Sequence, residues 1–145
     1  MKAQKFELKI PLLTAGRSTA TLPETSRTRI SLKFLAEGGE ENLHSHTYED
    51  QTYLVLDGEA TFYDSNDVST VVRCGEGILM PAGTRYRFVT TGDGPAVVLR
   101  IGGTTADGWA HYLDGNGDPL TLNPGTPRAV QAEGQFWTIN GVSKE

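Results

Sequence analysis

Short runs in which apolar and polar residues alternate constrain this chain more than any other sequence feature. From residue 28 to residue 34, one set of positions holds Thr28, Ile30, Leu32 and Phe34, and the intervening set holds Arg29, Ser31 and Lys33. Because successive side chains of a strand point to opposite faces, this pattern predicts a half-buried strand. No window of helical length maintains an apolar stripe at i, i+3 and i+4 along its whole length. The sequence therefore predicts an all-β protein.

Turn-forming residues divide the middle of the chain into further runs of the same kind. Strands are predicted over residues 51–57, 59–63, 69–73, 78–80, 86–90 and 96–101, and Gly, Pro, Asn and Asp lie between them. The run 96–101 is almost continuously apolar, which predicts burial on both of its faces. Short strands at regular spacing are typical of a β-sandwich or barrel.

The chain of 145 residues fits a single domain. We predict an N-terminal arm over residues 1–27, a barrel core over residues 28–103 and a loop-rich C-terminal arm over residues 104–145. Within the C-terminal arm we expect a hairpin across residues 114–117 and a final strand over residues 135–139. The aromatic residues of that strand need burial, so it should pack on the barrel or on a partner subunit.

Charge and composition exclude several classes of protein. The formal net charge is −5 and no run of Lys and Arg stands out, so no nucleic-acid partner is expected. The first ten residues lack the apolar core of a signal peptide, and no segment reaches the ~18 apolar residues of a membrane helix. The single cysteine, Cys74, rules out an intrachain disulfide. These features predict a cytoplasmic protein that does not contact a membrane.

Two of the three histidines form the sequence His44-Ser45-His46. Residues i and i+2 of a strand share a face, so the two imidazoles should project side by side. Neutral imidazole suits Zn, Fe, Ni or Cu, and carboxylate or amide oxygens can complete the coordination shell. A pair of surface histidines on an edge strand is the alternative interpretation of this pattern.

The residues around this pair resemble the two motifs of the cupin superfamily. The first motif would be Gly38, His44-Ser45-His46, Gln51 and Gly58, and the second would be Gly75, Pro81-Ala82-Gly83, Tyr86 and Thr90. The resemblance implies a single cupin barrel of the double-stranded β-helix, or jelly-roll, type. It also implies a homodimer in which an arm crosses between subunits, with Val98 in the interface.

Two positions depart from the superfamily pattern, which typically offers a Glu and a third His to the metal. Here these positions hold Gln51 and Tyr86. An amide oxygen is a weaker ligand than a carboxylate, and a phenol ligates a metal only as phenolate. Glu49 has the same parity as Gln51 in an unbroken strand and would supply the missing negative charge.

Three hypotheses follow for the pocket. In the first, His44, His46 and Gln51 bind a divalent transition metal (Fe, Mn, Ni, Zn or Cu), and Tyr86 and Glu49 act as acid/base residues. In the second, no metal binds, and the same residues bind a small metabolite or isomerise it by acid/base catalysis. In the third, the pocket is vestigial.

The leading functional expectation is an enzyme that acts on a small-molecule substrate through the metal, as a dioxygenase, isomerase or lyase. The metal-free binding protein or isomerase is the alternative. His111, in the C-terminal arm, would be either a third ligand or lid residue, or a packing or surface residue.

Overall fold

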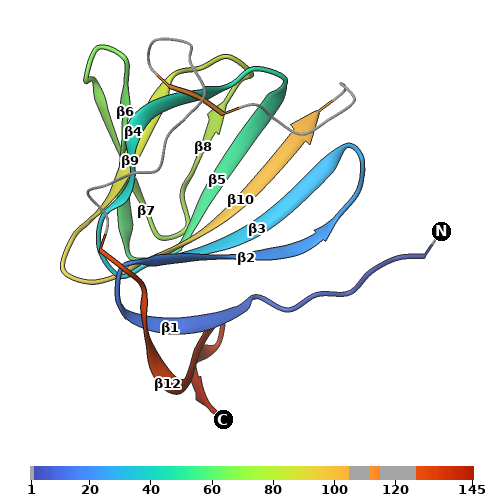
Figure 1. Ribbon diagram of the computed structural model, residues 1–145, viewed down its shortest axis with the longest axis vertical. Coiled ribbons are helices and arrows are strands. Elements are labelled where there is room, and N and C mark those ends of the chain that lie inside the picture. Colours follow the sequence, from blue (N-terminus) through green and yellow to red (C-terminus); the bar gives the residue numbers. More distant parts are fainter. Residues whose placement is uncertain (1, 105–111, 115–126) are drawn as a thin grey trace.

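A computed structural model describes residues 2–104, 112–114 and 127–145, and the regular structure in this part of the chain is entirely β. Two five-stranded sheets face each other (Figure 1). In spatial order the first sheet contains β2 (Arg17–Glu24), β3 (Thr28–Leu35), β10 (Ala96–Thr104), β5 (Glu49–Asp57) and β8 (Gly77–Met80). The second contains β11 (Tyr112–Asp114), β4 (Gly39–His46), β9 (Tyr86–Thr91), β6 (Glu59–Asp64) and β7 (Ser69–Arg73). The predicted jelly-roll arrangement is confirmed.

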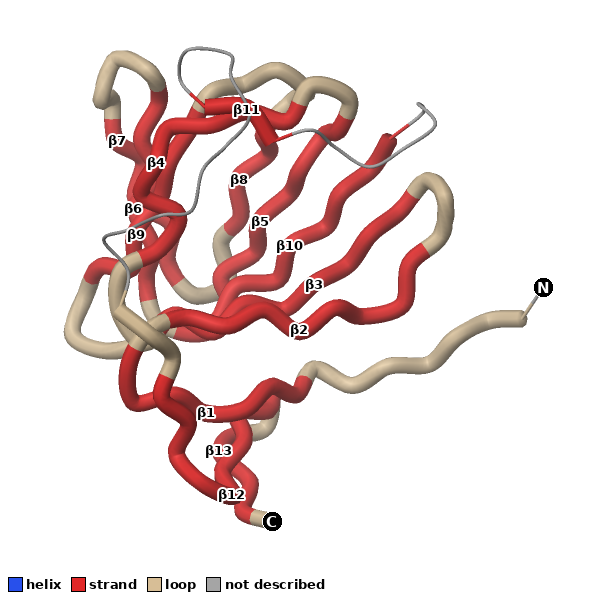
Figure 2. Tube along the Cα trace, in the orientation of Figure 1, coloured by secondary structure: helices blue, strands red, loops and turns tan. Residues whose placement is uncertain are grey.

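A smaller third sheet lies against the outside of the first sheet (Figure 2). It contains β1 (Lys9–Ala15), β12 (Val130–Thr138) and β13 (Gly141–Lys144), with β12 in the middle. The two segments predicted as arms therefore meet, since β1 comes from one and β12 from the other. β2, in the segment predicted as the N-terminal arm, pairs with β3 and extends the first sheet.

The space between the two large sheets contains the inner core. Its buried apolar residues come from both sheets: Leu35, Tyr53, Val55, Ala60, Phe62, Val72, Met80, Tyr86, Phe88, Ala96 and Val98. Val98 is fully buried here, so its expected place in a subunit interface was wrong. In the alternation along β10, it is the neighbours of Val98 that face outward.

A second core lies between the first sheet and the third sheet. There Leu32, Phe34 and Val97 pack with Ile10 and Trp137. β3 is consequently buried on both faces, and its polar set points into the barrel. Ser31 and Lys33 are 4% and 8% exposed, whereas the alternation alone predicted a solvent-facing side for them.

Gly58 makes the turn between β5 and β6 with a φ of +74°. Residues other than glycine rarely adopt this conformation. An added Cβ would lie 2.2 Å from the backbone oxygen of Pro95, so the turn also has no room for a side chain. This turn fixes where β6 begins and so aligns the two sheets.

The final strand predicted over residues 135–139 corresponds to β12 and packs on the barrel of its own chain. Of the hairpin predicted across 114–117, residues 115–117 lie outside the described residues, as does His111. In the described ranges, no helix has the length and hydropathy needed to cross a membrane.

Candidate functional site

β4 carries the two histidines into the space between the sheets. The register of β4 against β9 is interrupted between Glu40 and His44, where β4 has more residues than its partner strand. Such a bulge redirects side chains, and here both imidazoles end up inside the barrel, 1% and 3% exposed for His44 and His46. Their ring centroids are 5.5 Å apart in an edge-to-face arrangement.

Oxygen atoms lie close to both ring nitrogens of His44. Nδ1 is 2.7 Å from the carbonyl oxygen of Asn42, within the bulge. Nε2 is 3.2 Å from Oε2 of Glu40, and Oε1 of Glu40 accepts a 2.9 Å hydrogen bond from Lys33. His44 therefore connects the bulge of β4 to the ion pair between Glu40 and Lys33.

Glu40 is a half-buried carboxylate, 16% exposed, that lies close to Lys33 and His44. Burial by itself would raise the pKa of Glu40, but Lys33 and the contact with His44 outweigh burial and hold the pKa well below its usual range. Lys33 projects from β3 on the opposite sheet, so this ion pair links the two sheets across the interior. Neither Glu40 nor Lys33 was identified from the sequence.

Gln51, on β5, is the centre of a buried polar cluster. Its Oε1 atom accepts hydrogen bonds from Tyr53 Oη at 2.8 Å, from Tyr86 Oη at 2.9 Å and from Arg100 Nε at 2.9 Å. The Arg100 donor fixes the orientation of the amide, because the amide nitrogen of Gln51 could not accept that bond. Gln51 Nε2 is left buried, with no hydrogen-bond partner in the described part of the chain.

The two tyrosines of this cluster are also bonded to each other, with 2.6 Å between their hydroxyl oxygens. Two hydroxyl protons cannot fill all three contacts among Tyr53, Tyr86 and Gln51 at once. One contact at a time therefore lacks a proton. Burial raises the pKa of Tyr86 well above 10, and Tyr53 adds to that increase, so Tyr86 stays a phenol that donates a hydrogen bond.

Glu49 lies next to this cluster, on the inner side of β5. Its Oε1 atom accepts a hydrogen bond from Arg100 Nη2, and its Oε2 atom is 3.8 Å from Nδ1 of His46. Burial raises the pKa of Glu49, and Arg100 offsets that effect only in part. Burial and the Arg100 cation lower the pKa of His46 to about 3. A neutral imidazole thus faces a carboxyl that takes up a proton more readily than an ordinary glutamate.

All five residues proposed from the sequence (His44, His46, Glu49, Gln51 and Tyr86) converge in one buried site. Arg100 is the main residue that the sequence analysis missed. It stands in the apolar run 96–101 and shares a face of β10 with Val98, which the structure buries inside the barrel. As expected, Tyr86 and Phe88 point inward, whereas Arg87 stacks on Tyr63 outside the site.

The contacts in this site do not fit a divalent metal. A metal ligand must offer a lone pair, yet Gln51 Oε1 already accepts three hydrogen bonds. In the described ranges, no group of three or more His, Cys, Asp or Glu side chains has the arrangement of a metal site. Metal ligation by His44, His46 and Gln51 stays a prediction, and the geometry does not favour it.

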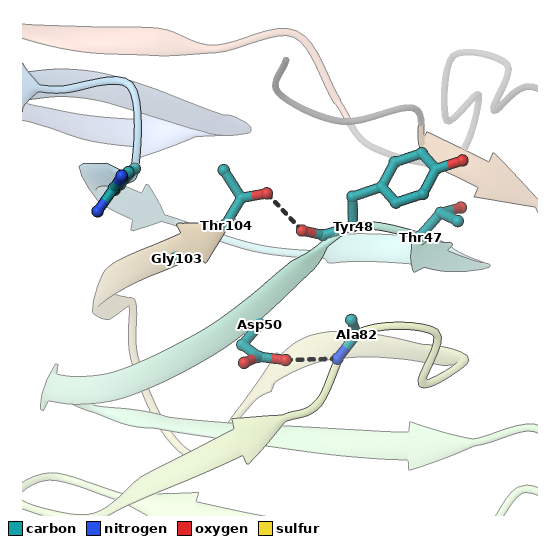
Figure 3. Close-up of a pocket in the computed structure, with 7 residues that line it drawn as sticks. Thr47, Tyr48, Asp50, Ala82, Gly103 and Thr104 are labelled. Carbon is teal, nitrogen blue, oxygen red and sulfur yellow. Dashed lines mark hydrogen bonds between the residues drawn. The ribbon is translucent and has the colours of Figure 1, made fainter. Parts of the chain in front are cut away.

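A depression of about 580 Å³ lies at the rim of the barrel, next to the turn between β4 and β5 (Figure 3). Its lining residues are Arg27, Thr47, Tyr48, Asp50, Ala82, Gly103 and Thr104. Hydrogen bonds from Thr104 to the Tyr48 carbonyl and from the Ala82 amide to Asp50 hold the rim together.

Comparisons with known proteins agree with this architecture. The family model described as "Cupin domain" matches residues 32–102. A solved structure of a conserved protein with a double-stranded β-helix domain from Klebsiella pneumoniae has a TM-score of 0.59 at 18% identity, covering 68% of this chain and 84% of that one. A cupin superfamily protein from Desulfitobacterium hafniense has a TM-score of 0.52 at 24% identity, with 61% and 77% covered.

A recombinant oxalate oxidase in complex with glycolate has a TM-score of 0.54 at 21% identity, covering 65% of this chain and 54% of the oxidase. No curated protein matches this sequence. At these identities the structural likeness establishes the fold and leaves the chemistry to be argued from the site.

Proposed function

The chain belongs to the cupin superfamily, and from that premise we propose that its barrel interior binds a small polar metabolite without the help of a metal. Buried polar groups normally have partners, because an unpaired one costs about 1–3 kcal/mol. The amide nitrogen of Gln51 is buried and has no partner in the described residues. This unpaired donor is the observation that carries the proposal.

The ligand that fits this site has an acceptor oxygen for Gln51 Nε2. Carboxylates, amides and hydroxyl-bearing compounds meet that requirement. The surrounding groups add ion pairs and hydrogen bonds between the two sheets, which suits a compact polar ligand. Glu49 Oε2 likewise has no hydrogen-bond partner in the described residues and offers an acceptor for a ligand donor.

Gln51→Glu tests the ligand contact with minimal change of shape. The variant keeps an oxygen for Tyr53, Tyr86 and Arg100 but replaces the Nε2 donor with an acceptor, which repels a ligand oxygen. Binding is measured by ligand-observed NMR with small carboxylates, amides and sugars as probes. Gln131→Glu makes the same chemical change at an exposed position of β12 and is the matched control.

We expect at least one class of probe to bind the wild-type chain and the Gln131→Glu control with equal affinity. Gln51→Glu should weaken that binding at least about tenfold, which corresponds to one lost hydrogen bond. Saturable binding that is the same in Gln51→Glu would contradict the proposed contact. Absence of saturable binding across all probe classes would contradict the proposed function.

A second candidate function, acid/base isomerisation or elimination, is favoured by the contact between Glu49 and His46. Their pKa values are displaced in opposite directions, up for Glu49 and down to about 3 for His46. Such divergence within one pair is typical of acid/base sites. In this function Glu49 exchanges the proton with the ligand, Tyr86 donates a hydrogen bond as a neutral phenol, and neutral His46 accepts one.

Glu49→Gln separates catalysis from binding. The variant keeps an oxygen for the hydrogen bond from Arg100 but cannot exchange a proton at neutral pH. A probe identified as a ligand is incubated with each protein in D₂O, and deuterium incorporation is followed by NMR. We expect exchange in the wild-type chain and at least about a hundredfold slower exchange in Glu49→Gln. Equal exchange in both would remove Glu49 from the chemistry.

A further inference from the structure

Arg100 places a cation beside Gln51, which stands at a metal-ligand position of the superfamily motif. It projects from β10 between the two sheets and is only 3% exposed. Its guanidinium bonds to Gln51 at the position of the usual ligand Glu, and to Glu49 two residues before it. We propose that the guanidinium of Arg100 replaces the divalent cation, so that this barrel excludes metal and is organised around a charge fixed to its own chain.

The first support for this proposal is the occupation of the ligand atoms. Gln51 Oε1 accepts three hydrogen bonds, one more than its two lone pairs accommodate ideally. A metal could bind this oxygen only by displacing Arg100 or a tyrosine. The second-motif position holds Tyr86, whose hydroxyl group donates a hydrogen bond to the same Gln51 oxygen.

The second support is charge balance inside the barrel. Glu49 is paired with Arg100, and Glu40 is paired with Lys33. Each buried carboxylate of the described interior thus already has a cation from the opposite or neighbouring strand. A divalent ion would add two positive charges without a carboxylate left to balance them.

The third support is the distance between the two cations. A metal bound to Gln51 Oε1 would lie about 2.1 Å from that oxygen, and Arg100 Nε lies 2.9 Å from the same oxygen. The two cations would be at most about 5 Å apart, where repulsion in a buried site is large. The fork of Arg100 is held by Gln51 and Glu49 together, so the guanidinium has no simple way to withdraw.

The direct experiment measures metal in the full-length chain purified without a histidine tag. The protein is incubated separately with Zn²⁺ and Co²⁺, excess ion is removed, and metal content is determined by mass spectrometry. We expect less than about 0.1 equivalent in the wild-type chain and the same content after His44→Ala plus His46→Ala. About one equivalent in the wild-type chain, lost in the double variant, would overturn the proposal.

A reversal experiment tests the role of Arg100 itself. Q51E together with Y86H restores the ligand types of the superfamily, and R100A is added to this background in a triple variant. Cobalt titration followed by visible absorption should give a Kd at least about 100-fold lower in the triple variant than in the double variant. Equal cobalt affinity would overturn the proposal.

Circular dichroism establishes that each variant is folded before it is titrated. If the triple variant does not fold, the metal content of the wild-type chain decides the question alone. The proposal does not depend on a ligand. A chain that excludes metal and binds no metabolite contradicts the proposed function, whereas a chain that takes up metal contradicts this inference whether or not it binds a metabolite.

Discussion

Acid should destabilise the folded chain through His46, because the buried imidazole resists protonation. Its pKa is about 3 in the folded chain and 6.5 in the unfolded chain. The unfolded state therefore binds more protons between these two values, so the free energy of unfolding falls as the pH falls from 6.5 toward 3. Above pH 6.5 the group makes no pH-dependent contribution.

The size of the effect follows from that difference. Each pH unit below 6.5 lowers the free energy of unfolding by about 1.4 kcal/mol, because the imidazole is protonated in the unfolded chain and not in the folded chain. The contribution of His46 to the loss is about 2 kcal/mol at pH 5 and about 3 kcal/mol at pH 4.5. Glu49 acts in the opposite sense over part of this range, because its raised pKa favours the folded state as protons are added.

Comparison with His46→Gln isolates the histidine, because the other groups titrate in both proteins. Urea unfolding is followed by tryptophan fluorescence at several pH values from 7.5 to 4.5. The stability difference between the two proteins should shift in favour of His46→Gln by about 3 kcal/mol across this range. Gln131→His, which adds an exposed imidazole on β12, should follow the wild-type profile. Parallel profiles for His46→Gln and wild type would refute the reasoning.

Three further changes have expected costs in the free energy of unfolding. Arg100→Leu should cost about 3–5 kcal/mol because Glu49 is left buried without its cation, and adding Glu49→Leu should restore part of the loss in urea titrations; no recovery would mean that the pair is not coupled. Gly58→Ala should cost more than about 2 kcal/mol, given its φ of +74° and the backbone oxygen 2.2 Å from an added Cβ. An unchanged melting temperature would contradict that steric argument. Trp137→Phe should cost about 1–2 kcal/mol by removing the 2.9 Å hydrogen bond to Asp57, and calorimetry that finds no loss would show the bond to be unimportant.

The sequence predicted the architecture because strand alternation and turn residues are local signals. The same-face rule placed His44 and His46 together, and the parity of Glu49 with Gln51 placed both inside. Tyr86 followed from its alternation with buried Phe88. These inferences needed only the period of a strand and the spacing of the motifs.

The polar half of the site could not be found in the same way. The alternation along β3 predicts that Lys33 faces the solvent, because Leu32 and Phe34 occupy the other face of the strand. Those two residues instead face the second core, and Lys33 points into the barrel. A strand buried on both faces gives no local sign of which face holds the site. Arg100 and Glu40 are functional candidates only because partners distant in sequence surround them, and that information exists only in three dimensions.

The pairing of β1 with β12 also has a consequence for synthesis of the chain. Their register joins Ile10 to Trp137. One of the first strands to be synthesised can therefore pair only after one of the last has been made. A nascent chain that has already made the residues of both large sheets still exposes Leu32, Phe34 and Val97 to the solvent. Closing so long a loop is slow. During that interval the growing polypeptide exposes an apolar surface. A chaperone or a neighbouring nascent chain can bind this surface before the third sheet covers it.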